Sequence, residues 1–141
     1  MRTRILVAEA DPVARLLLFQ CLAQGGYEVA LAETGDDAIA ELRKANPPPI
    51  AILESALSGM TADEICGRMR SADKLVYLIL MGEGLSVTDC LEAGADTYLR
   101  KPIVERELLG HIKLGLRAIE QRRAPEERTE IRESARGAEW S

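Results

Sequence analysis

Two glutamates and a lysine stand at equivalent places in this chain, each at or just after the end of a short apolar run. They are Glu9, Glu54 and Lys101. A carboxylate buried at the end of a strand costs free energy unless it has a partner or a chemical role. Two such carboxylates could hold a divalent cation, and the lysine ammonium could neutralise negative charge beside them. Glu54 and Lys101 could instead form a purely structural ion pair, because a lone buried charge is costly.

Five apolar runs must position these side chains, and they alternate with segments of helical pattern. Most runs are nearly continuous in apolar residues, which is typical of parallel strands covered on both faces. The alternation predicts right-handed crossovers and a three-layer α/β domain. The predicted strands are Ile5–Ala8, Tyr27–Ala32, Ile50–Leu53, Leu75–Met81 and Thr97–Leu99.

Helix boundaries are marked by capping residues. Asp11 precedes a proline, as an N-cap does, and Thr61 with Glu64 fits a capping box. Gly94 suits the end of a helix, and the last helix should run from about residue 104 to about 123. The carboxyl ends of parallel strands share one edge of a sheet, so the candidate residues should converge on one cleft.

Composition predicts one globular domain and excludes several classes of protein. The chain has 141 residues, of which 47% are hydrophobic, and a formal net charge of −5. That charge disfavours direct nucleic-acid binding, and no apolar run approaches the ~20 residues that would span a membrane. We expect a domain over residues 1–123 and a polar linker or tail over 124–141.

The three cysteines, Cys21, Cys66 and Cys90, fall in separate predicted helices. They are odd in number, and the N-terminal sequence has no secretion signal, so we expect a cytoplasmic protein. Its cysteines should then be reduced and packed as small apolar groups. Metal ligation by cysteine and histidine is not expected, since His111 is the only histidine.

The motifs ILVAEADP, ILESALSGM and LEAGADTYLRKP occur in the order and spacing of response-regulator receiver domains, which the chain resembles over about residues 4–123. The resemblance implies a flavodoxin-like, doubly wound α/β domain. Its five-stranded parallel sheet would have the order 2-1-3-4-5, with helices on both faces.

The same resemblance assigns roles to the strand ends, with three departures from the family pattern. Glu54 takes the place of the aspartate that accepts a phosphoryl group. Glu9 keeps one acid of a usual pair, but Ala10 replaces the acid that ligates the metal directly. Met81 replaces a hydroxyl residue that meets the phosphoryl group. Glu9 and Glu54 are then expected to bind magnesium weakly at most.

Three residues keep the family pattern. Lys101 would contact the phosphoryl group, and a cis peptide bond to Pro102 would aim it into the cleft. Tyr98 takes the place of the aromatic residue that reorients on activation. Two interpretations of Glu54 remain open: its charge and reach imitate a phosphorylated aspartate, or it is only the structural partner of Lys101.

From these residues we expect a signalling domain of a bacterial two-component pathway that is not an enzyme and acts by protein contacts without phosphorylation. The expected partners are a histidine kinase, a phosphotransfer protein or an output domain. The face of the fourth helix, fifth strand and fifth helix is the expected contact surface, for a partner or a second copy. The alternatives are a working phosphoacceptor domain and the N-terminal regulatory part of a larger enzyme or transcription factor.

Overall fold

The computed structural model describes residues 2–122, which form one five-stranded parallel sheet with the order β2-β1-β3-β4-β5. The fold class and strand order expected from the sequence are confirmed. The elements are β1 (Arg4–Ala8), α1 (Pro12–Gln24), β2 (Glu28–Ala32), α2 (Gly35–Leu42), β3 (Ile50–Glu54), α3 (Ala62–Ser71), β4 (Tyr77–Gly82), α4 (Val87–Ala93), β5 (Thr97–Arg100) and α5 (Glu105–Arg122).

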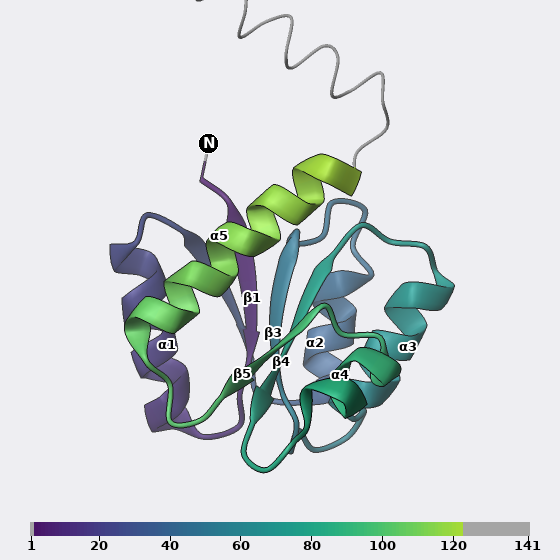
Figure 1. Ribbon diagram of the computed structural model, residues 1–141, viewed down its shortest axis with the longest axis horizontal. Helices are drawn as coiled ribbons and strands as arrows, with labels where there is room; N and C mark the ends of the chain where they lie inside the picture. The colour runs from purple at the N-terminus through teal and green to yellow at the C-terminus, as the bar shows by residue number, and fades with distance from the viewer. Residues whose placement is uncertain (1, 123–141) are drawn as a thin grey trace, which may run out of the picture.

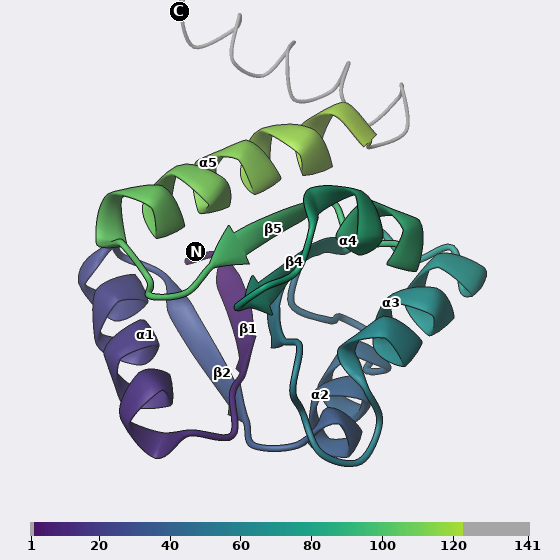
Figure 2. The same cartoon turned by 60° about the horizontal axis from the view of Figure 1, so that its bottom comes forward.

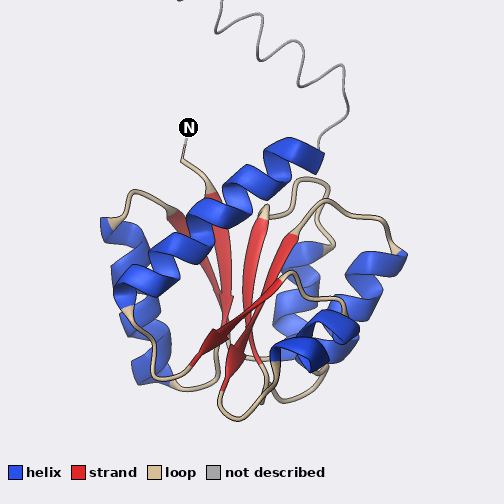
Figure 3. Ribbon diagram, in the orientation of Figure 1, coloured by secondary structure: helices blue, strands red, loops and turns tan. Residues whose placement is uncertain are grey.

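Helices cover both faces of the sheet. α1 and α5 lie on one face, and α2, α3 and α4 lie on the other (Figures 1 and 2). Alternate residues of β1 divide between the two cores: Ile5 and Val7 pack with α1 and α5, whereas Leu6 and Ala8 pack with the other three helices. The strands run through the centre of the molecule, between the two helical layers (Figure 3).

The central strands are buried along their whole length, as their continuous apolar sequences predict. Every residue of β3 and β4 is buried, and the register places Glu54 beside Met81. A charged residue therefore ends a strand that is otherwise apolar, at the edge where β1, β3 and β4 finish together.

The predicted caps are present. The Asp11 carboxylate accepts hydrogen bonds from the first amides of α1, and the Thr61 hydroxyl accepts one from the Glu64 amide. Gly94 ends α4 with a φ of 108°, a left-handed conformation that favours glycine. The cap of α2, Thr34, was not identified from the sequence.

Several strand boundaries differ from the expectation by one or two residues, and two strands start later than predicted. The Tyr27 amide donates to the Leu22 carbonyl and so closes α1 instead of beginning β2. Leu75 lies in the turn before β4 and is 42% exposed, so the fourth strand starts two residues later, at Tyr77. An apolar side chain alone could not show which of these residues joins the ladder. The linker or tail expected at 124–141 lies outside the described residues.

A polar network fixes α3 and α5 at the amino edge of the sheet. The Asp96 carboxylate accepts hydrogen bonds from Arg70 (2.6 Å) and from the Leu78 amide (2.7 Å), and it also pairs with Arg122. The Arg122 guanidinium lies 5.7 Å from the centre of the Tyr77 ring. The last turn of α5 is therefore attached to both β4 and β5. None of the described helices is long and apolar enough to cross a membrane.

Two glycines of α5 provide a matched test of how this helix packs. A Cβ at Gly115 would lie 2.7 Å from the Tyr77 ring, whereas a Cβ at Gly110 would meet nothing within 4 Å. Gly115→Ala should lower the free energy of unfolding by about 1–3 kcal/mol through overpacking. Gly110→Ala should raise it by up to about 1 kcal/mol through helix propensity. Urea denaturation measures both, and equal effects would contradict this packing.

Candidate functional site

The candidate residues meet at the carboxyl edge of the sheet, as the strand pattern predicts. Glu9 follows β1, Glu54 ends β3, Met81 lies in β4 and Lys101 follows β5. Glu9 is 2% exposed and Glu54 is 7% exposed, so these are the two buried charged residues among those that the structure describes. Two carboxylates this deeply buried require compensation.

Lys101 supplies that compensation by bridging both carboxylates. Its Nζ lies 2.9 Å from Glu9 Oε2 and also pairs with Glu54 Oε2. The Lys101–Pro102 peptide bond is cis, the form expected from the sequence, and the Lys101 amide donates to the Gly82 carbonyl at 2.9 Å. The Glu54–Lys101 pair was expected, but Glu9 as a second partner was not. One positive charge therefore serves two negative charges.

Hydrogen bonds from neighbouring residues hold the remaining carboxylate oxygens. The Asp11 amide donates to Glu9 Oε1 at 3.1 Å. Glu54 Oε1 accepts from the Ser55 hydroxyl at 3.3 Å and from the Ala56 amide at 3.4 Å. Ser55 was not singled out from the sequence, and the only available signal was a hydroxyl residue directly after the buried glutamate.

Gly82 makes room for the Ser55 hydroxyl. A Cβ at Gly82 would lie 2.4 Å from Ser55 Oγ and 3.6 Å from Glu54 Oε1. The absence of a side chain at position 82 thus lets the end of β4 approach the Glu54 side chain closely.

The electrostatics of the cleft separate the two glutamates. Burial raises the pKa of Glu9, and the neighbouring Glu54 carboxylate adds to this rise, while the hydrogen bond from Lys101 opposes it. Burial also acts to raise the pKa of Glu54, but hydrogen bonds from Lys101, Glu9 and Ala56 outweigh it and hold that pKa below its ordinary value. As the pH falls, Glu9 is therefore protonated first, and Glu54 keeps its negative charge to lower pH.

The lysine stays charged for the same reason. Burial alone would lower the pKa of Lys101, but the hydrogen bonds and charges of Glu54 and Glu9 outweigh it and raise the pKa above the ordinary value. The resulting unit is an ammonium held by an ionised Glu54, with Glu9 as a second and more readily protonated acceptor.

Met81 and Tyr98 lie beside this unit without entering its hydrogen bonds. Met81 is fully buried and packs in the apolar cluster on the α1 and α5 face. Tyr98 is 8% exposed, and its hydroxyl donates to the Gly82 carbonyl at 2.7 Å. Tyr98 is therefore attached to the end of β4 through the backbone of Gly82, whereas Met81 packs on the opposite face of the sheet.

The donor set fits a magnesium ion poorly. Ala10 has no carboxylate, and Lys101 already occupies one oxygen of each glutamate. The Arg15 guanidinium donates to the Glu9 carbonyl at 2.8 Å and to the Ala10 carbonyl at 3.3 Å, so a cation already lies against this loop. Within residues 2–122, no three acidic, histidine or cysteine side chains gather to hold a metal ion. Arg15 in this position was not anticipated from the sequence.

The other singled-out residues form none of the hydrogen bonds described above for Glu9, Glu54 and Lys101, although Cys21 lines a hollow that Lys101 also lines. Cys66 and Cys90 are buried free thiols, and burial raises the pKa of Cys66 to about 12. Burial and the nearby Glu105 raise the pKa of Cys21 to about 11. His111 Nδ1 lies 3.5 Å from the Thr97 hydroxyl, at the start of β5. None of these thiols has the low pKa of a reactive cysteine.

The two cleft glutamates should respond differently to neutralisation. Glu54→Gln should lower the free energy of unfolding at neutral pH by about 1–3 kcal/mol, because Lys101 loses the carboxylate that keeps its charge in the cleft. Glu9→Gln should cost less, because burial already disfavours the charge of Glu9. Urea denaturation of the two variants beside the unaltered protein measures the difference.

The pH profiles of these variants should have opposite signs. The contribution of Glu9 to stability is complete below the ordinary glutamate pKa of 4.5 and is lost as pH rises through its raised pKa. The contribution of Glu54 is complete above 4.5 and is lost as pH falls through its lowered pKa. The unaltered protein should lose stability relative to Glu9→Gln on raising the pH, and relative to Glu54→Gln on lowering it. Parallel profiles for all three proteins would contradict this assignment.

The chain spans about half the length of the curated relatives it matches. The transcriptional regulatory protein AfsQ1 of Streptomyces coelicolor is 35% identical over 115 residues, which cover 80% of this chain and 51% of the relative. The response regulator MprA of a Mycobacterium species (strain KMS) is 36% identical over 131 residues, which cover 90% of this chain and 54% of the relative.

Solved structures share the fold. A CheY-like response regulator receiver domain protein from Methanospirillum hungatei aligns with a TM-score of 0.78 at 27% identity, covering 86% of this chain and 98% of that one. A two-component response regulator from Clostridium difficile aligns with a TM-score of 0.74 at 25% identity, covering 82% and 97%. Residues 5–113 match the response regulator receiver domain. This chain therefore belongs to the response regulator receiver domain family of two-component signalling.

Proposed function

We propose that this receiver domain signals in the cytoplasm by protein contact and does not use phosphoryl transfer to Glu54. The observation that carries the proposal is the bridge from Lys101 to both Glu54 and Glu9. In this arrangement the Lys101 ammonium and the Glu54 carboxylate of the protein itself occupy the cleft.

The hydrogen bonds of Glu54 support this proposal. One carboxylate oxygen accepts from Ser55 and Ala56, and the other pairs with Lys101. A carboxylate that attacks phosphorus needs an oxygen directed at the incoming group in near-attack geometry. Transfer would therefore require Glu54 to give up existing contacts in a buried site before it could react.

The residues that would assist transfer are also missing. Met81 cannot donate a hydrogen bond to a phosphoryl oxygen, and Ala10 cannot ligate a metal ion. Positioning and electrostatic stabilisation provide almost all of the catalysis in phosphoryl transfer, so these losses act on the same step. Such a site retains the scaffold of a receiver without the groups that drive the reaction.

The contact surface that we propose is the face of α4, β5 and α5. Val87 and Leu91 on α4 are 56% and 50% exposed, and Leu114 on α5 is 51% exposed. These exposed apolar side chains lie on the two helices that flank the edge strand β5, where a partner could cover them. A histidine kinase, a phosphotransfer protein, an output domain or a second copy of the chain could bind there.

The second candidate is that this receiver regulates an output domain in the same protein. The relatives include a protein named as a DNA-binding response regulator, MtrA of Mycolicibacterium smegmatis, of which the matched residues cover 52%. An output region following the receiver would make the charged sequence after Arg123 a linker. Reading the genomic open reading frame past Ser141 tests this directly.

The unaltered protein should not gain the mass of a phosphoryl group when incubated with magnesium and acetyl phosphate. It should bind magnesium no more tightly than about millimolar, which corresponds to about 4 kcal/mol. Intact-mass measurement and titration calorimetry give the two results. A phosphoryl group that maps to Glu54 would refute the proposal, and so would micromolar magnesium binding.

The matched control restores the family residues in the same chain. A variant with Ala10→Asp, Glu54→Asp and Met81→Thr should bind magnesium more tightly and become phosphorylated at residue 54. The two interpretations of Glu54 are separated by the ring signals of Tyr98 in the NMR spectrum. If the Glu54 charge sets an active-like state, Glu54→Gln shifts these signals; if the pair is only structural, they stay in place.

A further inference from the structure

The outer face of α1 is apolar to an unusual degree. Of the ten large apolar side chains that are exposed among the described residues, four lie on this one helix. They are Val13 (65% exposed), Leu16 (54%), Leu17 (61%) and Phe19 (37%). A surface helix normally has an apolar stripe toward the core and a polar outer face, and a helix that is apolar all round is normally buried. α1 therefore presents more apolar surface than its own domain covers.

The exposed face of α1 also carries no charge. Arg15 is the one charged residue of the helix, and its side chain is only 16% exposed. Its guanidinium donates to the backbone carbonyls of Glu9 and Ala10, so it is turned toward the loop after β1. On α4, by contrast, the exposed Asp89 and Glu92 interrupt the exposed apolar side chains.

The apolar surface continues from α1 onto both of its neighbours. β2 is an edge strand, and Val29 packs in the core cluster on the face of α1 and α5. Leu31 lies two residues further along β2, so it projects from the same face, and it is 46% exposed. Toward α5, a hollow of about 560 Å³ is lined by apolar side chains that include Leu17, Ile103 and Leu108.

The two ends of α1 carry exposed charges of opposite sign. Near its start lie the exposed Asp11 and Glu33, whose side chain stays 70% exposed beside Arg15. At its other end, Arg2 lines a hollow of about 860 Å³ together with Gly26, which directly follows the C-cap of α1. Arg2 forms none of the ion pairs between described residues.

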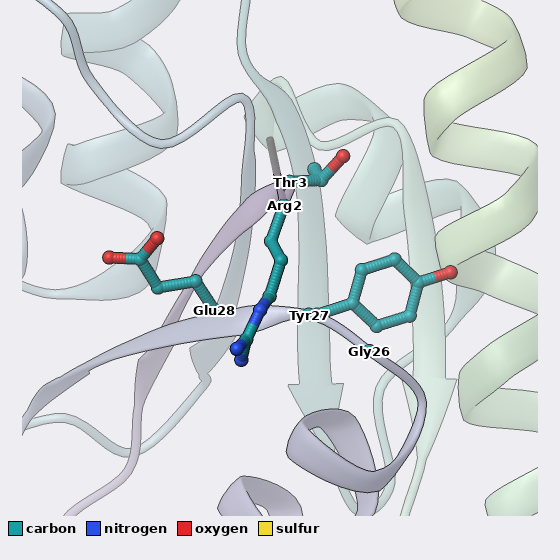
Figure 4. Close-up of a pocket in the computed structure, with 5 residues that line it drawn as sticks. All are labelled: Arg2, Thr3, Gly26, Tyr27 and Glu28. Atoms are coloured by element: carbon teal, nitrogen blue, oxygen red, sulfur yellow. The ribbon is translucent and has the colours of Figure 1, made fainter.

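Glu28 lies near Arg2 but projects away from α1. In Figure 4 the Glu28 carboxylate and the Tyr27 ring lie on opposite sides of the Arg2 side chain. Tyr27 packs against the core cluster of the α1 and α5 face, so the Glu28 carboxylate is directed to the other side of the sheet. Glu28 therefore does not offset the charge of Arg2 for a protein that binds at α1.

We propose that two copies of this chain dimerise through the α1 face, with the two α1 helices antiparallel. A twofold contact places the same surface on both sides, so a charged face would repel itself, whereas this face brings apolar side chains together. In the antiparallel arrangement Arg2 of one copy faces Asp11 and Glu33 of the second copy. The opposed helix dipoles favour the same arrangement.

The dimer should be weak and reversible. α1 has 13 residues, which at a rise of about 1.5 Å per residue give a helix about 20 Å long. One such helix with part of an edge strand forms a contact below the ~800 Å² per partner of a typical stable interface. α4 lies on the opposite face of the sheet (Figure 1), so its exposed side chains stay available to another partner. The proposal does not depend on the chemistry of the Glu54 cleft.

Sedimentation velocity of the full chain measures the monomer–dimer equilibrium. The sedimentation coefficient should rise from that of a monomer to that of a dimer between about 5 µM and about 500 µM. Leu16→Glu places like charges against each other in the middle of the contact and should weaken dimerisation at least about tenfold. Leu91→Glu is the matched control, because it adds the same charge at a 50% exposed position of α4 and should leave dimerisation unchanged. Circular dichroism checks that both variants fold.

An exchange of charges tests the orientation of the two helices. Arg2→Glu should weaken dimerisation about tenfold, and adding Glu33→Arg to the same chain should restore it. A double variant that dimerises as weakly as Arg2→Glu would overturn the antiparallel arrangement. A monomer at every concentration would overturn the whole proposal and leave the α1 face to a different protein. Dimerisation that Leu91→Glu abolishes and Leu16→Glu leaves intact would also overturn it, because the two copies would then meet through α4.

Discussion

A single ammonium group has to balance two buried carboxylates at the end of this sheet, and the rest of the site is arranged around that constraint. Lys101 reaches both Glu9 and Glu54, and its amide is held by the end of β4. Because burial of an unpaired charge is so costly, none of the three can be moved independently of the others. The positions of the three charged side chains in the cleft thus depend on one another.

Under the proposed function, this constraint leaves the receiver scaffold in place without phosphoryl transfer to Glu54. The sheet order and most of the buried strand residues depend on apolar packing on the two faces of the sheet, away from the cleft. The side chains of both glutamates reach the ammonium group of one lysine.

The sequence allowed the fold and the meeting of the site residues to be predicted, because both follow from local signals. Continuous apolar runs and capping residues determine the elements, and parallel strands must bring Glu9, Glu54 and Lys101 to one edge. The second partner of Lys101 could not be predicted, since it depends on which rotamers two long side chains adopt in a shared space. The Asp96 network was missed for a related reason: its arginines come from helices far apart in the sequence.

Boundaries were less predictable than contacts between strands. Tyr27 and Leu75 have the side chains of strand residues, but their amides take part in turn hydrogen bonds or lie outside the ladder. Whether a residue joins the ladder depends on which groups the tertiary structure places beside its backbone. The Leu78 amide, for example, donates to the Asp96 carboxylate. Side-chain type alone carries no information about those partners.

The central claim is that Glu54 stays ionised against Lys101 while Glu9 takes the first proton, and the side-chain carboxyl carbons report this directly. A ¹³C NMR titration of the folded protein should show Glu54 titrating below the ordinary glutamate value and Glu9 titrating above it. The titration of each carboxyl should also affect the signal of the other, because the two groups share one lysine. Two independent titrations near the ordinary value would contradict the account.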